Sequence, residues 1–119
     1  MTPSARFSRQ TIDGVAVVLA RGEIDTGNVH ELKAFLENST EPDGPGIVVD
    51  LNGVSYFDSR TIATLAEFSA RIRISRQRFA IVAADGGFAA KVLRIAGLTL
   101  VVPTLPTVAD AVTQVKSPV

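Results

Sequence analysis

Asp58 and Ser59 are the residues whose types and spacing best suit chemistry, because they stand where an apolar run gives way to an amphipathic pattern. The start of a helix has free backbone N–H groups and a partial positive charge, which favour a carboxylate, a hydroxyl or a phosphate. Asp58-Ser59 is therefore either a helix cap, which stabilises by about 1 kcal/mol, or an anion site. Arg60 is unexpected, because the first turn of a helix disfavours a cation.

Catalysis by these residues is not expected. A serine nucleophile needs a general base, and the one histidine, His30, lies in a different predicted helix with no motif linking it to Ser59. The chain has no cysteine, and a single histidine cannot form a metal cluster. Residues 85–87, Asp-Gly-Gly, lack the G-x-G-x-x-G pattern of nucleotide-binding loops, so we expect a plain tight turn. We predict no enzyme, no metal and no cofactor.

A second polar loop, at residues 22–26, follows another apolar run. Open α/β sheets bind their partners at the carboxyl ends of the strands, so this loop and the Asp58-Ser59 turn are expected at the same end of the sheet. Asp25 or Thr26 is expected to cap the helix that follows.

Strands and helices alternate in the predicted order β-β-α-β-α-β-α-β-α. Unbroken apolar runs predict strands buried on both faces at residues 15–20, 47–49 and 79–83. Weaker patterns predict an edge strand at 7–12 and a short last strand at 98–102. Asp13-Gly14 predicts a tight hairpin, so the first two strands are antiparallel. The alternation predicts an α/β fold with a mixed, mostly parallel sheet.

Four amphipathic helices are predicted between or after these strands. A short loop is expected between the strand at 47–49 and the helix that starts at Asp58, and a surface loop is expected at 37–46. Gly97 is expected to end the third helix. The residues expected to face the sheet are Val29, Leu32, Phe35 and Leu36; Ile62, Leu65, Ser69 and Ile72; Phe88, Val92, Ile95 and Ala96; and Val108, Ala111, Val112 and Val115.

Length and composition indicate a globular domain. The chain has 119 residues, 46% hydrophobic and 20% charged, so residues 1–119 are expected to form one domain with frayed ends at 1–5 and 116–119. Lys plus Arg and Asp plus Glu number 12 each, which argues against nucleic acid or an anionic membrane held by bulk charge. No apolar run approaches the roughly 20 residues of a membrane span. With no signal peptide visible, we expect a cytoplasmic protein.

Three segments together resemble the STAS domain, the fold of bacterial anti-sigma factor antagonists. Residues 47–59, IVVDLNGVSYFDS, resemble the family signature of an apolar strand, Asp-Leu, a small-residue turn, an apolar or aromatic pair and Asp-Ser. Residues 22–25, GEID, are similar to the family's Gly-x-[Leu/Ile/Phe]-Asp before its first helix. Residues 94–98, RIAGL, are similar to the end of its third helix. The segments occur in the family's order and span almost the whole chain.

The resemblance implies a STAS-like fold that works by binding other proteins. Antagonists of this family bind an anti-sigma factor, itself a serine kinase of the histidine-kinase-like ATPase class, and so free a sigma factor. The resemblance therefore implies regulation of transcription without direct nucleic-acid contact, and a weak homodimer stays open. It assigns partner binding to Asp25, Asp58, Ser59, Arg60 and Thr61.

The chain departs from the family at the phosphorylation switch. The family reads Asp-Ser-[Ser/Thr]-Gly with phosphate on the third residue, whereas here Arg60 stands in that position and Thr61 replaces glycine. A phosphate adds about −1.5 to −2 charges to an interface, and arginine cannot accept one. Three outcomes stay open. Ser59 or Thr61 accepts phosphate instead, with Arg60 available to pair with it; or the partner is bound without phosphorylation; or the surface serves another partner or a small ligand.

Overall fold

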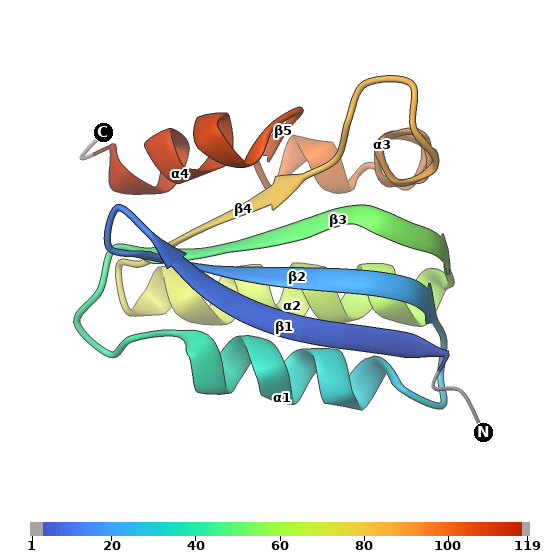
Figure 1. Cartoon of the computed structure of the whole chain (residues 1–119), viewed down its shortest axis with the longest axis horizontal. Helices are drawn as coiled ribbons and strands as arrows, with labels where there is room; N and C mark the ends of the chain where they lie inside the picture. The colour runs from blue at the N-terminus through green and yellow to red at the C-terminus, as the bar shows by residue number, and fades with distance from the viewer. Residues whose placement is uncertain (1–3, 118–119) are drawn as a thin grey trace.

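A computed structural model describes residues 4–117, which form a five-stranded sheet with helices on both faces (Figure 1). Within that range the strands are neighbours in chain order, and β1 is antiparallel to β2 while the other pairs are parallel. The predicted α/β fold and its order of elements are confirmed, with an added 3₁₀ helix, η1. The elements are β1 (Ala5–Ile12), β2 (Val15–Ile24), α1 (Val29–Ser39), β3 (Gly46–Phe57), α2 (Ser59–Ile74), β4 (Arg78–Val82), α3 (Phe88–Ile95), η1 (Leu98–Leu100), β5 (Thr104–Leu105) and α4 (Val108–Lys116).

The turn between β1 and β2 is the predicted tight hairpin. Asp13 has a φ of 50° and Gly14 a φ of 80°, the pair of left-handed conformations that a type I′ turn requires. Aspartate is one of the few side chains that tolerate this conformation, and glycine adopts it without steric cost. β1 therefore pairs with β2 from Ile12 beside Val15 onward and forms one edge of the sheet.

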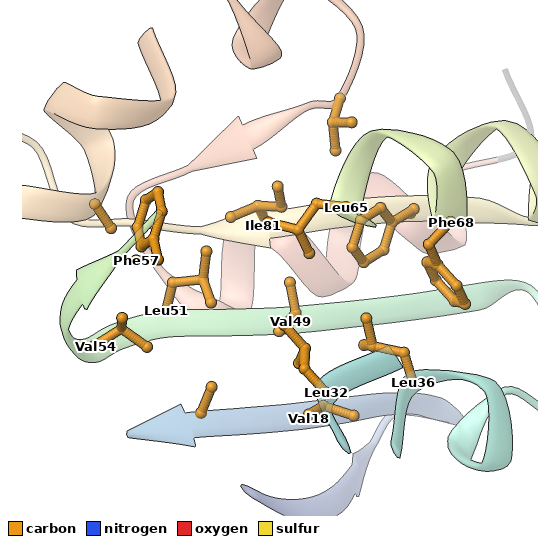
Figure 2. Packing of buried hydrophobic residues seen from close by; sticks show 14 of the residues in the cluster. Val18, Leu32, Leu36, Val49, Leu51, Val54, Phe57, Leu65, Phe68 and Ile81 are labelled. Atoms are coloured by element: carbon orange, nitrogen blue, oxygen red, sulfur yellow. The ribbon is translucent and has the colours of Figure 1, made fainter. Parts of the chain in front are cut away.

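The hydrophobic core lies on both faces of the central strands, as the unbroken apolar runs predicted. The helices α1, α2 and α3 cover one face, and α4 covers the other. Figure 2 shows Leu32 and Leu36 of α1 beside Val18 of β2 and Val49 of β3. The apolar faces predicted for α1, α2 and α4 are confirmed. Their fully or nearly buried members are Val29, Leu32, Leu36, Leu65, Ser69, Ile72, Ala111, Val112 and Val115.

β3 is longer than predicted, and no loop separates it from α2. Its second half keeps pairing with β2 as far as Ile24 beside Phe57. The polar residues among 50–56 are typical of a loop, and the sequence therefore predicted one there. Instead, two register shifts in the β2–β3 ladder let this stretch of β3 stay paired with β2. Because β4 pairs with β3 only as far as Asp50, Asp58 stands at the end of a sheet extension that β4 does not share.

The predicted strand at 98–102 is wrong. Gly97 has a φ of 80° and turns the chain into η1, where Leu98 is buried in the core. The last strand comes after Pro103, where residues 104–105 pair with the end of β4. The carbonyl of Pro103 accepts a hydrogen bond from the β4 backbone at 2.9 Å. Apolar composition alone cannot distinguish a short strand from a helical turn with buried side chains.

The predicted buried face of α3 is confirmed only for Val92, which packs against the core, and is wrong for Phe88, Ile95 and Ala96, which are exposed. Ala89 and Leu93 face the core, whereas Phe88 is 41% exposed and Ile95 is 77% exposed. The helix is apolar at every position except two. The spacing of its apolar residues therefore allows more than one side of the helix to face the core. Contacts of α3 with β3 and η1 select the side that is buried.

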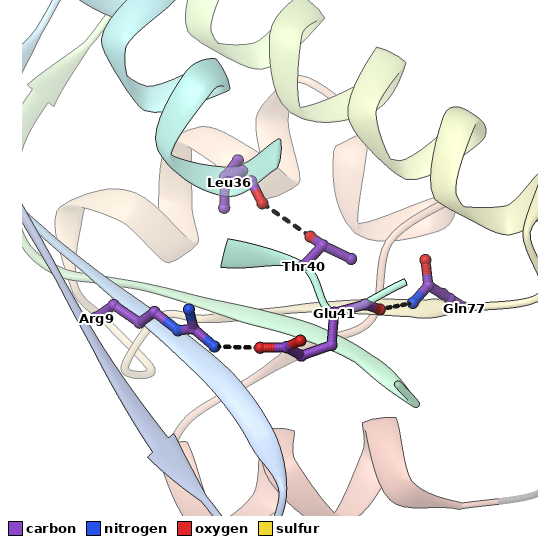
Figure 3. A network of polar contacts seen from close by, with 5 residues as sticks. All are labelled: Arg9, Leu36, Thr40, Glu41 and Gln77. Atoms are coloured by element: carbon purple, nitrogen blue, oxygen red, sulfur yellow. Dashed lines mark hydrogen bonds and ion pairs between the residues drawn. The ribbon is translucent and has the colours of Figure 1, made fainter. Parts of the chain in front are cut away.

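The loop between α1 and β3 is shorter than predicted, because α1 ends later than expected. Figure 3 shows how the loop is held: the buried Gln77 amide donates to the Glu41 carbonyl at 2.6 Å, and Arg9 pairs with the Glu41 carboxylate at 2.8 Å. The Thr40 hydroxyl donates to the carbonyl of Leu36 at 2.8 Å, within the last turn of α1. The loop is thus fixed to β1 and to the residue before β4.

Secondary structure begins and ends closer to the termini than predicted. Ser4, which was expected to fray, accepts a hydrogen bond at its carbonyl from the backbone N–H of Glu23 at 2.6 Å. Ala5 is the first residue of β1, and Lys116 is the last residue of α4. The strand and helix bounds thus include Ala5 and Lys116, while positions 1–3 and 118–119 lie outside the described residues.

Candidate functional site

Asp58 caps the start of α2. Its backbone is extended, and its Oδ1 accepts hydrogen bonds from the backbone N–H of Thr61 at 3.1 Å and from the Thr61 hydroxyl at 3.2 Å. Ser59 is the first residue of the helix. The capping interpretation is therefore confirmed for Asp58, and the threonine that replaces the family's glycine adds a second donor to the cap.

The loop before α1 is arranged differently from the prediction. Asp25 does not cap α1: its Oδ1 accepts from the backbone N–H of Gly27 at 2.9 Å, and its carbonyl accepts from Asn28 and Val29. This local turn keeps the chain non-helical until Val29. The Thr26 hydroxyl instead donates to Oδ2 of Asp58 at 3.3 Å, so the loop and the start of α2 form one corner.

Asn28 anchors this corner, and sequence reasoning missed it. Its side chain is 8% exposed; the amide nitrogen donates to Ser4 Oγ at 2.8 Å and to the Glu23 carbonyl at 3.0 Å, and Oδ1 accepts from the Asp25 backbone at 3.0 Å. An asparagine between a polar loop and an apolar helix was the available signal. Its partners include Ser4, the residue before β1, which only the fold brings close.

The Asp58 carboxylate is held in its ionised form. Loss of hydration through partial burial raises its pKa, but hydrogen bonds from the backbone and hydroxyl of Thr61, the Thr26 hydroxyl and the Arg60 backbone together lower it. The net pKa lies below the ordinary aspartate value, because each donor favours the charged form. Asp58 therefore keeps its charge, and its cap, at neutral pH.

The predicted site residues differ sharply in exposure. Asp25, Ser59 and Arg60 are exposed at the corner, Asp58 is half-buried, and Thr61 is 0% exposed. Arg60 also lines a shallow groove of about 290 Å³ between α1 and α2. The other lining residues are Thr26, Val29, His30, Lys33, Thr64 and Glu67.

This corner can present a hydroxyl and a cation to another molecule. Across residues 4–117, no three His, Cys, Asp or Glu side chains come together as metal ligands would. The same range contains no helix with the length and apolar character to cross a bilayer. An exposed corner of this kind suits contact with another protein.

The family model of the STAS domain matches residues 6–111. The chain belongs to the STAS domain family. Among curated STAS relatives, the anti-sigma-F factor antagonist RsfA of Mycobacterium tuberculosis is 29% identical over 117 residues, which cover 92% of this chain and 89% of the relative. The resemblance based on three sequence segments is thereby confirmed.

Solved structures of other proteins agree with the fold. An anti-sigma factor antagonist from Mycobacterium paratuberculosis superposes with a TM-score of 0.84 at 27% identity, covering 96% of each chain. The Bacillus cell fate determinant SpoIIAA in its phosphorylated form superposes with a TM-score of 0.65 at 17% identity, covering 93% of this chain and 100% of its own. At 17% identity the likeness shows the fold alone.

Proposed function

We propose that this STAS protein is an anti-sigma factor antagonist, a non-catalytic regulator that binds an anti-sigma factor and so frees a sigma factor for transcription. The observation that carries the proposal is the similarity to the mycobacterial anti-sigma-F factor antagonist over most of both proteins. The solved antagonist with a TM-score of 0.84 supports it. The proposed partner is an anti-sigma factor of the histidine-kinase-like serine-kinase class, met in the cytoplasm.

The proposed partner surface is the corner where the β2–α1 loop meets the start of α2. Asp25, Ser59 and Arg60 are exposed there and supply the polar contacts. Asp58 and Thr61 lie behind them and bond to each other. In this proposal both residues position the surface, and neither forms its main contact with the partner.

Ser59 is the phosphate acceptor in this proposal. It is exposed at the first residue of α2, whereas the Thr61 hydroxyl is buried and already donates to Asp58. A phosphate on Ser59 would add about −1.5 to −2 charges beside the Asp58 carboxylate and within the partner contact, which disfavours the complex. It would also offset the positive charge of Arg60.

A pull-down tests the function. The immobilised full chain is incubated with an extract of its source organism, and the retained proteins are identified by mass spectrometry. We expect an anti-sigma factor, bound at least about tenfold more weakly by Arg60→Glu. Glutamate suits the first turn of a helix, so this variant should fold. Lys116→Glu, at the end of α4 on the opposite face, is the matched control and should bind normally.

Other outcomes would contradict the proposal. Repeated pull-downs that retain no anti-sigma factor would contradict the proposed partner. Native mass spectrometry of the chain purified from its source provides a second check, since a bound metabolite is the result expected of a ligand-sensing STAS module.

A further inference from the structure

α3 and η1 expose large apolar side chains that the proposed corner does not use. Phe88 is 41% exposed, Ile95 77%, Leu100 87% and Val101 55%; we call these four residues the α3 surface. Phe88 and Ile95 stand about two helical turns apart and so share one side of α3. Single exposed apolar residues are ordinary, but several on neighbouring elements indicate an interaction site.

The α3 surface adjoins the proposed corner through aromatic packing. The Phe88 ring meets the Phe57 ring edge to face, with 5.3 Å between centroids, and Phe57 directly precedes Asp58. Farther along, Arg73 of α2 donates to the carbonyl of Val101 at 3.3 Å. α2 therefore borders both surfaces, and a partner seated on the start of α2 can continue onto α3.

The two charged residues of α3 are both positive. Lys91 and Arg94 are the only charged residues between positions 86 and 109 of the sequence, and both are exposed on α3. Helical spacing puts Lys91 between Phe88 and Ile95 on the exposed side. Neither cation forms an ion pair with any residue in the described range 4–117. The surface is thus complementary to apolar side chains flanked by carboxylates.

We propose that the α3 surface binds an apolar segment of the anti-sigma factor that carries acidic side chains beside its apolar ones. This inference rests on the proposed function and extends the partner surface from the start of α2 onto α3 and η1. A second copy of the chain fits less well, because a symmetric contact would bring Lys91 and Arg94 of each copy together. A bilayer fits less well because α3 has only eight residues and its other side is buried in the core.

Calorimetric titration of the full chain with the anti-sigma factor retained in the pull-down tests this inference. Ile95→Asp should weaken binding by at least about tenfold. The double variant Lys91→Glu/Arg94→Glu should bind more weakly at low salt and lose part of the salt dependence of the wild type. Ile74→Asp is the matched control, since Ile74 is 84% exposed on α2 but outside the α3 surface; it should bind normally. Circular dichroism checks that each variant folds.

The outcomes separate this inference from the proposed function. Wild-type binding that neither α3 variant alters overturns the inference and leaves the function standing, whereas absence of wild-type binding contradicts both. Two further measurements test the other occupants of the α3 surface. Vesicles of phosphatidylserine and phosphatidylcholine test a bilayer, and analytical ultracentrifugation of the chain alone tests a second copy. Vesicle binding that requires Lys91 and Arg94, or self-association that Ile95→Asp removes, would reassign the surface and overturn the inference.

Discussion

The Thr26 hydroxyl lies 3.3 Å from Oδ2 of Asp58 and donates a hydrogen bond to it, across 32 positions of sequence. The other carboxylate oxygen of Asp58 accepts from Thr61. Both oxygens of Asp58 are therefore occupied within the chain, and the residue joins the β2–α1 loop to α2. A side chain with this bonding organises a surface more than it offers contacts to a partner.

Asp58→Ala should lower the free energy of unfolding by about 1 kcal/mol, because the N-cap of α2 is lost. The folded pKa of Asp58 lies below its unfolded value of about 3.9, so its stabilising effect is present above that pH and is lost as pH falls through the folded pKa. Urea unfolding at several pH values should show the difference from wild type shrinking below about pH 4. Asp85→Ala, in an exposed turn, is the control; a pH-independent difference would contradict the role of the carboxylate charge.

Thr61→Val should raise the pKa of Asp58, because it removes the hydroxyl that donates to Oδ1 at 3.2 Å while keeping a similar shape. Thr61→Ser keeps the donor and should leave the pKa near that of the wild type. Carboxyl titration followed by NMR measures both variants. Equal pKa values in all three proteins would show that the hydroxyl does not stabilise the charged cap.

Incubation with the cognate kinase and ATP should add phosphate to Ser59 and not to Thr61, because Ser59 is exposed and Thr61 is buried. Ser59→Ala should abolish incorporation, and Thr61→Ser should not change its site. Peptide mass spectrometry locates the modified residue. Phosphate found on residue 61 would mean that the start of α2 opens before the reaction.

Gly22→Ala should be more destabilising than Gly14→Ala, although both glycines have positive φ angles. A Cβ at Gly22 would lie 2.3 Å from the Ser4 carbonyl oxygen, whereas a Cβ at Gly14 would meet nothing within 4 Å. Gly14→Ala should cost about 1–2 kcal/mol from backbone strain alone, measured by chemical denaturation. Because Ser4 also contacts Asn28, Gly22→Ala should weaken partner binding as well. Equal stability losses would show that β1 moves aside freely.

Gln77→Ala should lower the free energy of unfolding by about 1–3 kcal/mol, because it leaves the carbonyls of Glu41 and Gly44 without their side-chain donor. Thermal unfolding compares it with Gln10→Ala, an exposed glutamine of β1 whose loss should cost little. A matched effect of the two substitutions would show that water replaces the Gln77 amide at no cost.

The sequence by itself determined the family, the order of strands and helices, the hairpin at Asp13-Gly14 and the cap at Asp58. These features depend on neighbouring residues: left-handed conformations favour Asp and Gly, caps favour Asp, and buried strands are continuously apolar. For the same reason Gly97 was correctly expected to end α3, where its φ is 80°.

Only the tertiary structure decided which residues of those elements reach solvent and which side chains of distant segments bond to one another. Thr61 is hidden and Ile95 is exposed, because the way each helix packs on the sheet, not its own apolar spacing, selects its buried side. Asn28 reaches Ser4 across 24 positions, as Thr26 reaches Asp58. Contacts over such separations require the sheet to bring the strand ends together, and local sequence carries no direct signal for them.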